Sequence, residues 1–318
     1  MTTAATNCEK LFSCYYAGLS PPNWSATPDE SMMRRCKVFY HEGDSRADVA
    51  RLVREREPVN MTAHRMYHQD RLLDHFGFQT GHYGSCGPSA NDITPPNFIV
   101  YTPTEIRVPD GPTYPAVHIL NAIGLAFDSE DQPDYKTYHK LADPVTDKDD
   151  AAWEIGGHSS QLRQCALFYE RLFTLIFETA RRLGKPNIVM SFVGANNFAM
   201  YWAGGPEQFR RTVWAPTFND VAQRYPDLNI MFMGAVANRK ARYKNVGMFP
   251  KLLEHPDIKN KLDDTLLINA WDCWSVPGNG NERDNSLDGY MGRFSQIGVN
   301  GTSLTNPYLA IESNYVSI

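Results

Sequence analysis

The sequence predicts an α/β fold in which a largely parallel sheet is covered by helices. From about residue 95 onward, apolar strands alternate with helical segments, and this alternation is typical of parallel sheets. Two of the apolar strands also lead directly into loops rich in Gly and Asn. Ligands of open parallel sheets bind at the carboxyl ends of the strands, so these two loops are the candidate binding site.

The predicted elements begin with an apolar strand at 116–127. A polar stretch follows and includes the acidic loop DSEDQPDY. A strongly amphipathic helix is predicted at 160–183, because apolar residues recur there at helical spacing and Gly184 ends the pattern. The remaining elements, in chain order, are a strand at 187–193, a helix at 218–225, a strand in LNIMFMG, a mixed loop and helix segment at 238–262 and a strand at 265–270.

The first 95 residues are predicted to form an N-terminal extension, and residues 96–318 the principal domain. The extension contains no long periodic element, although 46–57 and 64–75 have the composition of helices. The sequence assigns this part of the chain no role.

Composition and charge narrow the range of partners and compartments. A net charge of -5 and a pI near 6.0 argue against binding to nucleic acid or to an anionic membrane, since both partners favour a basic face. No run of 18 apolar residues is present, and Glu9 and Lys10 stand where a signal peptide would have its apolar core. We therefore expect an intracellular protein, cytoplasmic or delivered into a host cytoplasm. The six cysteines show no C-x-x-C spacing, so we expect reduced thiols and no metal site.

The familiar nucleotide and hydrolase motifs are incomplete or absent. GNGNER supplies only the first two glycines of G-x-G-x-x-G and follows its strand after seven residues rather than in a tight turn. The sequence contains no G-x-x-x-x-G-K-[ST], no H-E-x-x-H and no G-x-S-x-G. Kinases, zinc proteases and α/β-hydrolases are thereby disfavoured.

The stretch LINAWDCWSVPGNGNERDNSLDGYMGR, residues 267–293, resembles the first ligand loop of the macrodomain family. That loop follows a strand ending in Asn-Ala, contains a glycine triplet and continues with Val-Asp-Gly at the start of a helix. Here the corresponding residues are Asn269 and Ala270, then Gly278, Asn279 and Gly280, then Leu287, Asp288 and Gly289. Six residues, NERDNS, intervene before Leu287, and Asn279 replaces the central glycine. Asparagine tolerates left-handed backbone better than most residues, so the turn remains feasible.

Other stretches are similar to further parts of the same family. SFVGANNF is similar to its second ligand loop, Ser-x-Gly-x-x-Gly, with Ser191, with Gly194 one place late and with Asn197 where the next glycine falls. AVHILNAIG is similar to its IHxVGP strand, and GVNGTSLTNPYL to the strand after the first loop's helix. In the family the Asn-Ala loop comes before these pieces, whereas here it comes last. The resemblance therefore implies a circularly permuted macrodomain-like fold, with a mixed, mostly parallel sheet between helices, over roughly residues 100–318.

The resemblance is closest to divergent macrodomains of bacterial effectors and their eukaryotic relatives, some of which remove ADP-ribose from arginine. It implies that the pyrophosphate of ADP-ribose lies between the two loops, where backbone N–H groups can hold an anion without Lys or Arg, and that the Asn269 amide bonds a ribose hydroxyl. No cofactor is then required. The implied ligand contacts are Asn269, Ala270, Gly278, Asn279, Gly280, Ser191, Gly194, Ala195, Asn196, Asn197 and Phe198.

Several of these residues also have structural interpretations. Asn269 at a strand end can simply satisfy backbone groups, and Asn196 and Asn197 can form an ordinary turn. His118 is expected to be a satisfied core or surface residue rather than a ligand. We also expect Gly194→Glu to block ligand binding while leaving the fold intact.

Hydrolysis at the distal ribose develops positive charge on an oxocarbenium-like carbon, so a carboxylate is needed to stabilise that charge or to activate water. The candidates are Asp272, Asp284 and Asp288. Asp288 is preferred because it matches the family's Val-Asp-Gly aspartate, although it could instead complement a helix dipole, as Asp284 could shape a turn.

We therefore expect a hydrolase that removes mono-ADP-ribose from a modified protein. The alternatives are a reader that binds ADP-ribosylated partners without cleaving them, and a nucleotide-dependent transferase or oxidoreductase on an ordinary doubly wound sheet. The acidic loop DSEDQPDY is either a solvated turn, a recognition loop in which Asp128 or Asp134 pairs with a guanidinium, or a site for a divalent cation.

Overall fold

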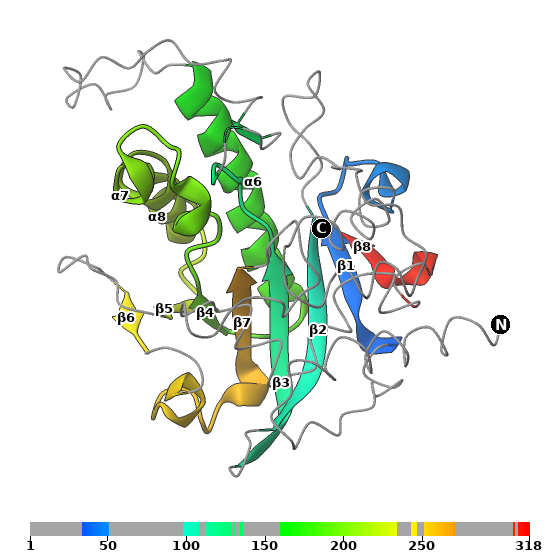
Figure 1. Ribbon diagram of the computed structural model, residues 1–318. Helices are drawn as coiled ribbons and strands as arrows, with labels where there is room; N and C mark the ends of the chain where they lie inside the picture. Colours follow the sequence, from blue (N-terminus) through cyan, green and yellow to red (C-terminus); the bar gives the residue numbers. More distant parts are fainter. Residues whose placement is uncertain are drawn as a thin grey trace, which may run out of the picture.

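The computed structural model describes residues 34–50, 98–107, 112–128, 130, 134–135, 160–233, 243–246, 251–270, 308 and 311–318, and its centre is an eight-stranded sheet (Figure 1). The strands are β1 (Lys37–Tyr40), β2 (Phe98–Arg107), β3 (Thr113–Ala122), β4 (Asn187–Met190), β5 (Asn229–Phe232), β6 (Lys244–Asn245), β7 (Thr265–Ala270) and β8 (Tyr315–Ser317). Their order across the sheet is β6-β5-β4-β7-β3-β2-β1-β8.

Most neighbouring strands in this sheet are parallel. β3, β7, β4, β5 and β6 form one continuous parallel block, β2 runs antiparallel to both β3 and β1, and β8 is parallel to β1. The prediction of an α/β fold with a mixed, mostly parallel sheet is confirmed at this level. β7 is also notable for its position, because it follows β4 and β5 in the chain but lies between β3 and β4 in the sheet.

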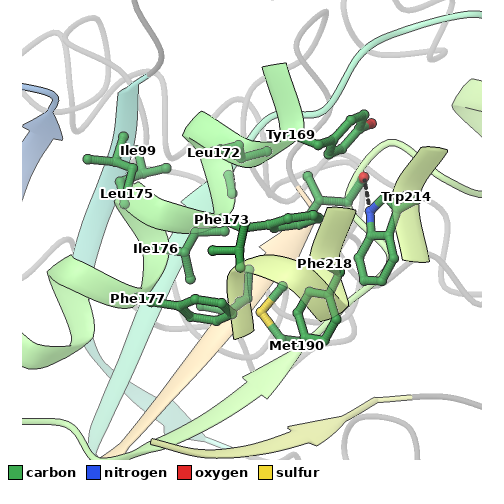
Figure 2. Packing of buried hydrophobic residues seen from close by; sticks show 14 of the residues in the cluster. Ile99, Tyr169, Leu172, Phe173, Leu175, Ile176, Phe177, Met190, Trp214 and Phe218 are labelled. Atoms are coloured by element: carbon green, nitrogen blue, oxygen red, sulfur yellow. Dashed lines mark hydrogen bonds between the residues drawn. The ribbon is translucent and has the colours of Figure 1, made fainter. Parts of the chain in front are cut away.

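Helix α6 (Ser160–Arg182) agrees closely with the helix predicted at 160–183. Its buried side chains, among them Leu172, Phe173 and Ile176, form one face that packs on the sheet (Figure 2). Gly184 follows at a φ of +65°, a left-handed conformation that glycine adopts without steric cost and that ends the helix. Amphipathic periodicity and this terminal glycine were therefore sufficient to predict the element.

A second helical segment lies beside α6 on the same face and extends beyond the prediction. α7 (Gly205–Phe209), the π-helical turn η2 (Arg210–Trp214) and α8 (Ala215–Gln223) follow one another without a break, whereas the sequence predicted a helix only at 218–225. Pro216 lacks the N–H that would bond to the carbonyl group four residues earlier. The wider π-helical turn directly before α8 accommodates that missing bond.

The two faces of the sheet are covered differently in the described part of the chain. On the face of α6 and α8, a large aromatic cluster includes Phe173, Trp214 and Phe218 (Figure 2). On the other face, Val189 and Leu267 pack with Leu252 and Leu253 of the 3-10 turn η3 (Lys251–Glu254). Val49 of the helical residues 46–50 also packs on this second face, against Val38 and Val100. The prediction of a sheet between helices stays a prediction, because long helices cover only one face in the described residues.

The region before residue 95 contributes directly to the sheet. β1 lies between β2 and β8, and residues 46–50, the start of the helix expected at 46–57, are helical. Arg171 of α6 donates from Nη2 to both carboxylate oxygens of Asp44, at 2.8 and 2.7 Å. The division into 1–95 and 96–318 stays a prediction, and the helix expected at 64–75 lies outside the described residues. Within the described segments, no helix is both long enough and apolar enough to cross a lipid bilayer.

Candidate functional site

The carboxyl ends of β3, β7 and β4 meet at one edge of the sheet. β7 is hydrogen-bonded to β3 on one side and to β4 on the other, and both pairings are parallel; the arrowhead of β7 points towards this edge in Figure 1. The loops that follow these strands consequently begin side by side. This edge brings the predicted Asn269 and Ala270 together with the predicted contacts of the loop after β4.

The loop after β4, residues 191–199, is a compact turn. Ala195 N donates to the Phe192 carbonyl oxygen at 3.0 Å, Gly194 has a φ of +70°, and the 3-10 turn η1 (Asn197–Ala199) follows. Asn196 and Asn197 are exposed, whereas Ser191, Gly194 and Ala195 are buried and Phe198 is half-buried. Of the predicted contacts in this loop, the two asparagines therefore have the most accessible side chains.

Gly194 is held in place by close backbone packing. A Cβ on Gly194 would lie 2.3 Å from Tyr169 Oη and 2.8 Å from Gly124 Cα. The expectation that Gly194→Glu leaves the fold intact is therefore wrong, because the space that a side chain needs is already filled. The role of Gly194 as a ligand contact stays a prediction, and it would have to act through its backbone.

The segment after β3 is part of the same assembly. The sequence predicted a strand up to 127, but β3 ends at Ala122, because the backbone groups of Phe127 bond to the loop beyond β4 instead of to a neighbouring strand. Phe127 N donates to the Phe198 carbonyl oxygen at 2.5 Å, and Tyr201 N donates to the Phe127 carbonyl oxygen at 2.7 Å. These bonds fix the loop after β4 against the exit of β3.

The acidic loop contributes a structural carboxylate. Asp134 is 1% exposed, and its Oδ2 accepts a hydrogen bond from Ala126 N at 2.8 Å. Asp134 therefore does not face a guanidinium of an outside partner, which corrects one of the expectations for DSEDQPDY. Asp128 is half-buried, and its role as a recognition residue stays a prediction.

A hydrogen-bonded chain of two asparagines lies beneath the carboxyl edge. Asn121 and Asn269 are opposite each other in the register of β3 and β7, and both are fully buried. Asn269 Nδ2 donates to Asn121 Oδ1 at 2.9 Å. Asn121 Nδ2 donates to the Val100 carbonyl oxygen and to Thr102 Oγ1, each at 3.2 Å. Sequence reasoning found Asn269 but missed Asn121, whose only signal was a polar residue inside the apolar stretch AVHILNAIG.

Ser191 adds a hydroxyl group at the same carboxyl edge. Val189 of β4 is in register with Leu267 of β7, and Ser191 directly follows the end of β4 at Met190. Ser191 is 5% exposed, and its Oγ has no hydrogen-bond partner within the described residues. A buried polar group without a partner costs about 1–3 kcal/mol, so a further polar group at this position would stabilise the site.

Arg210, which the sequence analysis did not identify, fixes the loop from the side of η2. Its Nη1 donates to the Ala195 carbonyl oxygen at 3.1 Å and to Asn196 Oδ1 at 2.6 Å, and its guanidinium lies 5.8 Å from the centre of the Phe192 ring. Trp214 Nε1 donates to the Val193 carbonyl oxygen at 3.1 Å (Figure 2). The turn between α7 and α8 thus anchors the loop through two side chains.

His118 lies at the opposite, amino edge of the parallel block. Its Nδ1 accepts from Tyr101 OH at 2.7 Å, and its Nε2 donates to Asp263 Oδ1 at 2.9 Å, since a carboxylate can only accept. Lys185 Nζ is also close, 3.0 Å from Nε2. Burial lowers the pKa of His118, despite the opposing effect of Asp263, and burial raises the pKa of Tyr101 to about 12. Both ring nitrogens of His118 therefore have partners, as expected for a satisfied core or surface residue.

The remaining predicted site residues lie outside the described residues. They are Asp272, Asp284 and Asp288, proposed for catalysis, and Gly278, Asn279 and Gly280, proposed for ligand contact. Their roles stay predictions. Within the described segments, no group of three or more His, Cys, Asp or Glu side chains is arranged to hold a metal ion.

Comparison with known proteins does not assign this chain to a family. A scan of the chain against protein-family models finds no match, and a search of curated proteins finds no significant relative. The function therefore has to be inferred from the residues at the carboxyl edge and from the chemistry that they can perform.

Proposed function

We propose that the carboxyl edge of β3, β7 and β4 binds ADP-ribose and that the protein removes mono-ADP-ribose from modified proteins. The observation that carries this proposal is the pairing of β7 with β4 in parallel. The two stretches that resemble the two ligand loops of macrodomains follow these two strands. A pyrophosphate held by both loops requires them to begin side by side, and this pairing meets that requirement.

The strand order supports a circularly permuted macrodomain-like fold. β7, which ends in Asn269 and Ala270, is the last strand of the parallel block along the chain, yet it is inserted between β3 and β4. In the family that the sequence resembles, the corresponding strand comes first. Moving this strand in the chain order while keeping its place in the sheet is what a permutation does.

The described residues offer suitable groups for such a ligand. The turn at 191–199 carries backbone N–H groups that can face an anion, as loops of this kind do. Asn196 and Asn197 are exposed there, and the Arg210 guanidinium bonded to Asn196 adds positive charge beside the loop. An acidic protein can in this way hold a pyrophosphate locally.

Catalysis is assigned to the carboxylates of the loop after β7. Breaking the bond between the distal ribose and the target side chain leaves an oxocarbenium-like carbon, water supplies the new oxygen at that carbon, and a proton goes to the departing side chain. Asp288 is the preferred residue to stabilise the charge or to activate the water, with Asp284 and Asp272 as alternatives. This chemistry uses the protein's own residues, and the modified protein is the substrate.

Two measurements test the proposal. Calorimetric titration should show that ADP-ribose binds more tightly than NAD or AMP, whereas a preference for NAD would favour the nucleotide-dependent transferase or oxidoreductase. Release of ADP-ribose from arginine-, glutamate- and serine-modified proteins should then be followed for the parent and for Asp272→Ala, Asp284→Ala and Asp288→Ala.

Asp288→Ala should lower turnover roughly 100-fold or more while changing ADP-ribose affinity little, because the group acts in the transition state. A parent protein that binds ADP-ribose but releases none from any substrate would be a reader. If only Asp284→Ala or Asp272→Ala is inactive, the catalytic carboxylate is that residue instead.

A further inference from the structure

The hydrogen-bonded chain beneath the carboxyl edge has a fixed direction. It begins at the Val100 carbonyl oxygen, which can only accept, so the group of Asn121 that faces it must be the Nδ2 amide. Both N–H bonds of that amide are used, one on Val100 and one on Thr102 Oγ1. The oxygen of Asn121 is therefore the atom that faces Asn269.

The direction passes on to Asn269. Because Asn121 presents an oxygen, Asn269 has to present Nδ2 to it, and the 2.9 Å bond between these atoms follows from that requirement. The two asparagines are directly opposite each other in adjacent strands and are both fully buried, so neither amide can turn over without breaking the chain. The amide nitrogen of Asn269 therefore faces Asn121, and the acceptor oxygen, Oδ1, faces away from Asn121.

We infer that Asn121 is a positioning residue that sets the polarity of Asn269, so that this end of the site selects a ligand with a hydroxyl donor. The inference rests on the proposed function, and the donor there is a hydroxyl of the distal ribose. Phosphate oxygens have no proton to donate at neutral pH and are not favoured at this position. The buried Ser191 hydroxyl follows the end of β4 at the same carboxyl edge and has no partner in the described part of the chain, so it is a second group that a sugar hydroxyl can satisfy.

The test compares ADP-ribose with ADP, which lacks the distal ribose. Calorimetry on the whole protein should show that Asn121→Ala reduces the preference for ADP-ribose over ADP by roughly 3- to 10-fold, the range of one neutral hydrogen bond. The affinity for ADP itself should not change, since the pyrophosphate contacts that we propose lie in the loops after β4 and β7. Asn121→Asp should retain most of the preference, because a protonated carboxyl group can donate to Val100 and accept from Asn269.

Asn187→Ala is the matched control. Asn187 is also buried in the sheet, donates from Nδ2 to the Asp264 carbonyl oxygen at 3.3 Å and accepts from Asn229 Nδ2 at 2.9 Å, but it lies at the amino edge. Its loss should lower stability as the loss of Asn121 does, without changing the preference for ADP-ribose. If Asn121→Ala does not fold, Thr102→Val is the alternative. It removes one of the two acceptors of the Asn121 amide and should also reduce the preference for ADP-ribose over ADP.

The outcomes separate the inference from the proposed function. A parent that prefers ADP-ribose and an Asn121→Ala or Thr102→Val variant that keeps the full preference contradict the inference alone. Equal loss of preference in Asn121→Ala and Asn187→Ala contradicts it as well, because the effect would then be one of general stability. A parent that binds neither ligand contradicts the proposed function and, with it, the inference.

Discussion

Replacing Gly194 by Ala should destabilise the protein more than an ordinary glycine substitution in a turn. Gly194 has a φ of +70°, a conformation that costs an L residue about 1–2 kcal/mol. The new methyl group would also lie 2.8 Å from Gly124 Cα and 3.0 Å from Leu125 N. These are backbone atoms that cannot rotate away, and overpacking of this kind typically adds about 1–3 kcal/mol. The expected loss of unfolding free energy is therefore about 2–5 kcal/mol.

Gly184→Ala is the matched control for the cost of placing alanine in a left-handed backbone conformation. Gly184 has a similar φ of +65°, but a Cβ there would have no atom within 4 Å. Its substitution should therefore cost only the conformational term, about 1–2 kcal/mol. The difference between the two variants isolates the packing of the loop after β4 against the exit of β3.

Urea unfolding followed by circular dichroism gives the free energies of both variants by linear extrapolation. Gly194→Ala should have a clearly lower midpoint than Gly184→Ala, with a similar slope. If Gly194→Ala is no less stable than Gly184→Ala, the close contact between Gly194 and Gly124 does not hold the two loops together, and the assembly of the carboxyl edge described above is refuted.

Two further predictions concern Arg210 at the carboxyl edge and His118 at the amino edge of the sheet. Arg210→Ala should weaken ADP-ribose binding roughly 3- to 10-fold, because it releases the loop at Ala195 and Asn196. Arg211 bonds to Gln208 instead, so Arg211→Ala should leave the affinity unchanged. Equal losses of affinity in calorimetry would contradict a role for Arg210. Burial holds the pKa of His118 below its usual 6.5, so near this pH the unfolded chain binds more protons than the folded protein. The stability that neutral His118 contributes is therefore present above pH 6.5 and is lost as the pH falls below it. His118→Gln should therefore show a smaller fall in urea midpoint on acidification than the parent, and an equal fall would contradict the prediction.

Local patterns were sufficient for the elements that build the parallel block. The helix at 160–183 and the strands at 187–193 and 265–270 were predicted from periodicity and apolar runs, and α6, β4 and β7 confirm them with small changes at the ends. The sequence also indicated that two Gly/Asn loops follow parallel strands. Their adjacency could not be deduced from these patterns, because strand order is a property of long-range pairing.

Features that depend on contacts between distant residues were missed. β1 was not predicted, since its four residues join the sheet only by pairing with β2 and β8. The burial of Asp134 depends on its bond to Ala126, and the importance of Asn121 depends on Asn269, 148 residues away in the chain. An apolar stretch with one asparagine gives no indication of which residue will be its partner.

Hydrogen exchange with and without ADP-ribose tests the location of the site most directly, because it reports the protection of each backbone segment. We expect ADP-ribose to slow exchange in residues 191–199, where the loop after β4 meets the carboxyl edge, and to leave Leu262–Asp264 at the amino edge unchanged. Unaltered exchange in 191–199 under saturating ADP-ribose, or protection only near Lys185 and Asp263, would contradict a site at the carboxyl ends of β4 and β7.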